Sequence, residues 1–122
     1  MFTKADARNM MTSSVETQGL LLMFQRRISD FRYTNTYPVV SFNATVEDYS
    51  ALHFTSIELD ESRKRIHSSS CTCSKGRHSN TICQHKAALL LVWAHNRENA
   101  QIELNGEPER EKSIDQEVLQ FL

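Results

Sequence analysis

The sequence predicts a small α+β domain, with an antiparallel sheet of about three strands and flanking helices. Residues 39–46 alternate apolar and polar side chains, as a half-buried strand does, and residues 51–59 form a second strand-like run. Residues 84–97 form an apolar segment of helical length. The chain of 122 residues has the size of one domain.

Capping residues and a proline indicate where the predicted helices and strands begin. Ser13 and Glu16 have the spacing of a capping box, which opens a helix that ends near residue 28. Pro38 suits a strand start, and the strand at 64–70 is polar and basic enough for an exposed edge. After Ser113, apolar residues predict a last short helix.

Three regions follow from this order: 1–49 supplies the first helix and strand, 50–97 forms a ββα unit, and 98–122 is acidic. The middle of the 84–97 helix is apolar on almost every side, whereas a helix with one face in solvent carries polar residues on that face. Either the N-terminal helix covers its second side, or the helix presents a protein interface with Leu90 and Trp93 as anchors.

The cysteines are clustered. Cys71 and Cys73 precede a nine-residue spacer, and Cys83 and His85 follow it. Three cysteines cannot all pair in disulfides, whereas three cysteines and a histidine suit a closed structural zinc site. Residues i and i+2 of an extended segment face the same side, so the first two cysteines can share one metal. His78 in the spacer is the alternative histidine ligand.

This arrangement, CxC–x9–CxH between strands and an apolar helix, resembles the SWIM-type zinc finger over residues 50–97. Ala88 also matches the CxHxxA extension of the SWIM subunit in Shu-type recombination complexes. Ser74 and Lys75 stand where the family often has a proline or an aromatic residue. The resemblance implies one structural Zn²⁺, and the family is associated with DNA binding and protein interaction. The four ligands it implies are Cys71, Cys73, Cys83 and His85.

Charge is segregated along a chain whose net charge is −1. Residues 62–97 carry seven basic and no acidic side chains, while residues 98–122 carry seven acidic and two basic ones. The basic window is either a solvated face that balances its acidic neighbours or a surface for phosphates. The candidate phosphate contacts are Arg63, Lys64, Arg65, Lys75, Arg77 and Lys86.

Several function classes lack their motifs. Four protein ligands leave zinc no open position for water, and the chain has neither a GxSxG nucleophile motif nor a glycine-rich phosphate loop. We therefore expect no enzyme and no small-molecule substrate. The longest apolar run, 87–94, is too short to span a membrane, and the N-terminus lacks a signal-peptide pattern. These features favour an intracellular protein of the cytoplasm or nucleus, without membrane contact.

Two functions remain. The first is a zinc-stabilised module that binds nucleic acid, most simply DNA, through its basic surface. The alternative is a protein-interaction subunit of a DNA repair, recombination or mobile-element complex. In that case the apolar helices bind a protein partner or a second copy, and zinc only holds the fold together.

Overall fold

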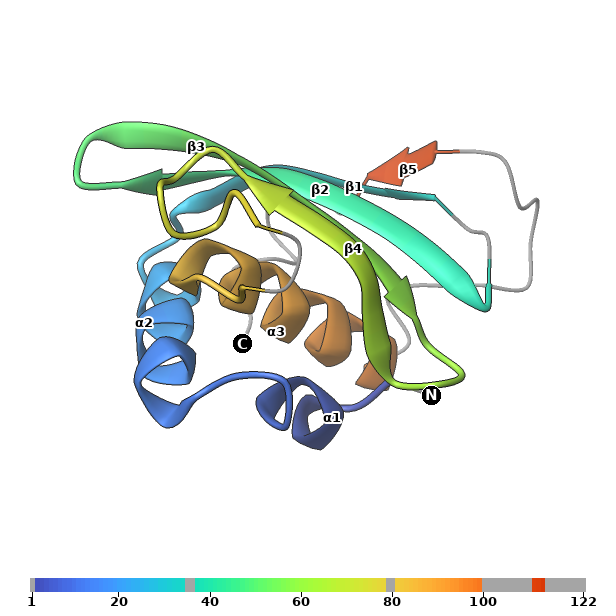
Figure 1. The fold of residues 1–122 in the computed structure, drawn as a ribbon. Helices are drawn as coiled ribbons and strands as arrows, with labels where there is room; N and C mark the ends of the chain where they lie inside the picture. The colour runs from blue at the N-terminus through green and yellow to red at the C-terminus, as the bar shows by residue number, and fades with distance from the viewer. Residues whose placement is uncertain (1, 35–36, 79–80, 100–110, 114–122) are drawn as a thin grey trace.

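The computed structural model describes residues 2–34, 37–78, 81–99 and 111–113, which form two layers (Figure 1). One layer is an antiparallel sheet with the strand order β4-β3-β2-β1-β5, and the helices cover one face of it. The elements are α1 (Lys4–Arg8), α2 (Ser13–Phe24), β1 (Ile28–Thr34), β2 (Val39–Asp48), β3 (Ala51–Asp60), β4 (Arg65–Cys71), α3 (Gln84–Glu98) and β5 (Glu111–Ser113).

The α+β class is confirmed. The three strands expected from the sequence correspond to β2, β3 and β4, and β4 lies at one edge of the sheet, as expected. β2 and β3 pair without interruption from Val39 opposite Asp60 to Asp48 opposite Ala51. The sheet also contains β1 and β5, which the sequence analysis did not predict. The helix expected after Ser113 lies outside the described residues.

The two N-terminal helices pack against α3. α1 has a complete capping box, in which Thr3 and Asp6 satisfy each other's backbone N–H groups. α2 begins where the sequence predicts, but its cap is Thr12, whose hydroxyl accepts the Val15 N–H, so the prediction of a Ser13 capping box is wrong. Gly19 lets α2 approach α3 closely, since a Cβ there would lie 3.0 Å from a backbone nitrogen of α3.

The core lies between α3 and the sheet. The Trp93 ring stacks on Phe42 of β2 at a centroid distance of 4.8 Å and meets Tyr33 of β1 edge-on. Its Nε1 donates a hydrogen bond of 3.0 Å to the buried carboxylate of Glu61, which also holds the Arg97 guanidinium through two bonds. This carboxylate satisfies polar groups that burial would otherwise leave unpaired.

The interface predicted at Leu90 and Trp93 is wrong for this fold. Both side chains have 0% exposure and belong to the hydrophobic core. α2 and α1 cover the side of α3 that the sheet leaves open, which is the simpler of the two explanations for an all-round apolar helix. No helix within the described ranges combines the length and apolar character needed to cross a membrane.

Candidate metal centre

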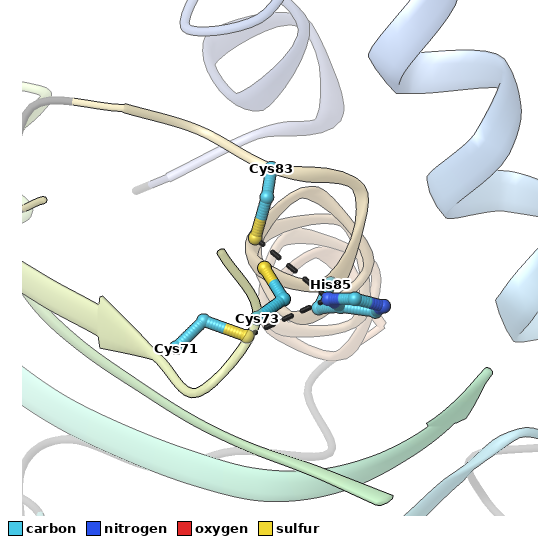
Figure 2. A group of neighbouring side chains, drawn as sticks. All are labelled: Cys71, Cys73, Cys83 and His85. Carbon is cyan, nitrogen blue, oxygen red and sulfur yellow. Dashed lines mark hydrogen bonds between the residues drawn. The ribbon is translucent and has the colours of Figure 1, made fainter. Parts of the chain in front are cut away.

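Two chain segments that follow one another in sequence bring the four predicted ligands together. Cys71 is the last residue of β4, and Cys73 follows it at the start of the zinc loop, which we define as residues 72–82. Cys83 is the N-cap residue of α3, and His85 lies in the first turn of that helix. Figure 2 shows the three sulfur atoms and the His85 ring converging on one region.

The geometry fits one zinc ion. The four ligand atoms lie within 4.8 Å of one another, and Nδ1 of His85 is 3.5 Å from Cys71 Sγ and 3.9 Å from Cys83 Sγ (Figure 2). Tetrahedral zinc with Zn–S distances of about 2.3 Å and Zn–N distances of about 2.0 Å needs its ligand atoms at such separations. Soft thiolates with one imidazole are a donor set that zinc prefers. The predicted structural Zn²⁺ therefore has a matching site.

The ionisation of the cluster suits a cation. A hydrogen bond from the Cys83 thiol, with further bonds from His85 and Thr55, lowers the pKa of Cys71 to about 3 against the effect of burial. The same Cys71–Cys83 bond and burial raise the pKa of Cys83. Burial lowers the pKa of His85, but hydrogen bonds to Cys71 and Asp48 outweigh it and raise that pKa to about 9. Zinc binding at neutral pH must therefore displace protons from Cys83 and His85.

Gly76 closes the loop around the site. Its carbonyl accepts the Cys71 N–H at 2.9 Å, and its own N–H donates to Cys73 Sγ at 3.1 Å. A Cβ at this position would lie 2.6 Å from Cys71 Cβ and 2.7 Å from Cys83 Sγ. Only a residue without a side chain leaves the cysteines room to meet around a metal, so the glycine is required by space rather than by its backbone conformation.

Sequence reasoning missed the groups that orient His85. Asp48, at the end of β2, lies 2.8 Å from His85 Nε2, so its carboxylate fixes the ring with Nδ1 turned towards the sulfurs. The His53 ring of β3 is half-buried and stacks on His85 at a centroid distance of 4.1 Å. His78, the alternative ligand, is not part of the cluster.

Lys86 is not a phosphate contact, contrary to the sequence prediction. Its side chain has 0% exposure, and its ammonium group donates to the carbonyls of His78 and Thr81 at 2.8 and 2.9 Å. Desolvation lowers its pKa. Lys86 therefore ties the zinc loop to α3 from inside the protein, through two carbonyls of that loop.

A comparison with protein-family models matches residues 53–94 to the SWIM zinc finger. This segment is therefore similar to the SWIM zinc finger. The match contains all four ligands and the strand–loop–helix frame that holds them, as the sequence resemblance implied. No curated protein and no solved structure matched the chain.

The other predicted phosphate contacts fall into two groups at opposite ends of β4 (Figure 1). Arg63, Lys64 and Arg65 lie at the β3–β4 turn, where Arg63 pairs with Asp60 and Lys64 pairs with Asp6. Lys75 and Arg77 lie in the zinc loop, and both are exposed. The basic window of the sequence is therefore not one continuous surface.

Proposed function

We propose that this chain is a non-catalytic zinc module that binds nucleic acid through the cations of its SWIM finger. One observation carries the proposal. Lys75 and Arg77 flank Gly76 on a loop that the metal ligands hold in place, both are exposed, and neither has an ion-pair partner within the described part of the chain. Exposed cations on a rigid support are suited to phosphate contacts.

The remaining basic residues contribute less to this surface. Lys64 donates to Asp6 at 2.6 Å, and Arg63 lies 3.8 Å from Asp60, so local carboxylates offset part of their charge. Arg65 is exposed, but β4 places it about 20 Å from the zinc loop at 3.3 Å per residue. It could extend the contact surface along a ligand, whereas the zinc loop forms its centre.

The ligand set of the zinc supports a binding role without catalysis. Catalytic zinc keeps one position for water or substrate, whereas here four protein side chains are available to fill all four positions of a tetrahedral zinc. The metal then contributes folding free energy and fixes the loop, since structural zinc sites couple metal binding to folding. Lys75 and Arg77 depend on it for their position, because the loop begins and ends at metal ligands.

Fluorescence anisotropy with labelled DNA at about 50 to 200 mM salt tests the proposal, because several phosphate contacts lose much affinity over this range. The variant is Lys75→Glu with Arg77→Glu, and the matched control is Lys4→Glu with Arg8→Glu in α1, which changes the net charge equally. We expect the zinc-loop variant to lose binding and the control to keep it. Binding that both variants weaken equally, or no binding by the parent at the lowest salt, refutes the proposal.

A specific surface favours protein interaction as the second candidate function. Leu21 and Phe24 on α2 and Tyr49 in the β2–β3 turn are exposed. Leu21 and Tyr49 line an open groove of about 700 Å³, with Phe24 on the same helix. Exposed apolar side chains beside a groove are typical of protein-binding sites. A second copy of the chain is a suitable partner for this surface, because in a symmetric dimer both copies use the same surface patch.

Light scattering on the purified zinc-loaded protein tests the second candidate. A dimer that becomes a monomer in the Leu21→Asp, Phe24→Asp variant, with zinc content unchanged, supports a homodimer through α2. A parent protein that is monomeric at every concentration excludes the second copy. Nucleic-acid binding is expected to survive this variant, because neither substituted residue is a metal ligand or belongs to the zinc loop.

A further inference from the structure

Phe54 is an exposed aromatic residue on a rigid strand. Its side chain is 61% exposed, in the middle of the fully paired β3. Because β3 alternates, its neighbour Thr55 points inward and contacts Cys71 Sγ at 3.2 Å, while Phe54 points to the face of the sheet that the helices do not cover. The core gains nothing from a phenylalanine in this place, so its ring is available to a ligand.

The backbone joins Phe54 directly to the zinc loop. Its N–H donates to Thr72 Oγ1 at 3.0 Å, and its carbonyl accepts the Thr72 N–H at 3.2 Å. Thr72 is the first residue of the loop, and Gly76 folds back to accept the Cys71 N–H. Lys75 is three residues from Thr72, so its Cα lies within about 11 Å of Thr72. An aromatic plane and two cations are thus fixed in one neighbourhood.

The charges around Phe54 determine where a phosphate chain can run. Farther along the same face of β3, Glu58 accepts a hydrogen bond from Ser68, and its carboxylate repels phosphates. On the neighbouring strand β2, Glu47 lies opposite Leu52 of β3 and forms an ion pair with Arg27, which offsets its charge. Phosphates next to a base on Phe54 are therefore attracted towards the zinc loop and repelled from the middle of the sheet.

We propose that the nucleic acid bound by the finger is single-stranded, with one base stacked on Phe54 and the neighbouring phosphates on Lys75 and Arg77. This inference rests on the proposed function and makes it more specific. In a duplex the base faces are stacked on each other, so an aromatic ring on a strand face has no base plane to contact. A single strand offers its bases, and cations beside an aromatic plane are typical of proteins that bind it.

The test compares a labelled mixed-sequence oligonucleotide of about 12 nucleotides, as a single strand and annealed to its complement, a length within the usual site sizes. The zinc-loaded full chain should bind the single strand more tightly. Phe54→Ala should weaken single-strand binding by roughly 5- to 150-fold, the cost of losing one base–aromatic stack. The matched control is Phe24→Ala, since Phe24 is 63% exposed on α2, and we expect no change from it.

A second variant gives a direct readout of stacking. Trp93, the only tryptophan of the chain, is fully buried, so Phe54→Trp adds a separate exposed fluorophore, and Phe24→Trp adds one at the control position. Single-stranded DNA should quench the first and not the second. Equal affinity for duplex and single strand, or no effect of either Phe54 variant, overturns the inference. The proposed function does not fall with it, because the Lys75→Glu, Arg77→Glu variant tests that function separately. Absence of binding to either DNA form refutes both.

Discussion

Gly76→Ala should disrupt the metal centre although it adds only one methyl group and removes no ligand. The new Cβ would lie 2.6 Å from Cys71 Cβ, 2.7 Å from Cys83 Sγ and 3.0 Å from Cys73 Sγ. Ordinary van der Waals contact begins near 3.4 Å, so two of the cysteines must move by about 0.7 to 0.8 Å or the loop must shift as a whole. None of these atoms is the free end of a flexible side chain, because each belongs to a metal ligand.

The expected loss of affinity follows from this displacement. Metal–ligand distances tolerate about 0.2 Å, which is well below the required shift. Losing an outer-shell hydrogen bond typically costs 10- to 100-fold in metal affinity, and the alanine both displaces thiolates and strains the bond from Gly76 N–H to Cys73 Sγ. We therefore expect zinc affinity to fall by at least about 100-fold, or about 2.7 kcal/mol of zinc-linked stability.

Competition with a chromophoric chelator measures this loss, and thermal denaturation with and without zinc measures its effect on the fold. Gly19→Ala is the matched control, since its Cβ would meet α3 at 3.0 Å and its three nearest neighbours are atoms of Ala87 and Ala88 rather than of a metal ligand. That variant should lower stability and leave zinc affinity unchanged. Zinc affinity of Gly76→Ala within about threefold of the parent would show that the cysteines do not enclose the metal as described.

Three further predictions follow from the buried charges. Asp48→Asn should lower zinc affinity by about 10-fold or more, measured by the same competition, because the carboxylate 2.8 Å from Nε2 orients His85. Glu61→Ala should cost about 3–5 kcal/mol in urea unfolding, since it leaves the Arg97 guanidinium partly buried and unpaired, and an unchanged midpoint would contradict this role. The logarithm of zinc affinity should rise by at least about two per pH unit between pH 6 and 8, because binding displaces the raised-pKa protons of Cys83 and His85 and also requires the Cys73 thiolate. Calorimetry in buffers of different ionisation enthalpy counts the protons released, and fewer than about two per zinc would contradict the assignment.

The ligand set could be predicted because its information is local in sequence. Cys71 and Cys73 share the end of one strand, and Cys83 and His85 share the start of one helix, so short spacings describe the geometry. The partners of these ligands are not local. Asp48 precedes His85 by 37 residues and contacts it only because β2 ends beside α3, which no spacing rule in the sequence expresses.

β1 escaped prediction because its pairing is irregular. A bulge between Ser29 and Arg32 breaks the register with β2, and Asp30 has a left-handed φ of 56°. The inward residues Ile28 and Phe31 are therefore three apart, which imitates helical spacing and makes the strand look like a continuation of the helix before it. In the structure that helix ends at Phe24, whose side chain is exposed.

Charge segregation in the sequence was a poorer guide to the surface than the ligand spacing was to the site. The basic window contains no carboxylates of its own, yet Asp6, Asp60 and Glu61 from outside it pair with three of its cations, and Lys86 is buried. A charge count along the chain cannot anticipate partners that the fold supplies from elsewhere. Arg63, Lys64 and Arg65 stay exposed at the far end of β4, but two of them pair with carboxylates, whereas Lys75 and Arg77 have no ion-pair partner among the described residues. A ligand that requires free cations in fixed positions beside an aromatic ring would therefore bind at the zinc loop, next to Phe54, rather than along the whole basic window.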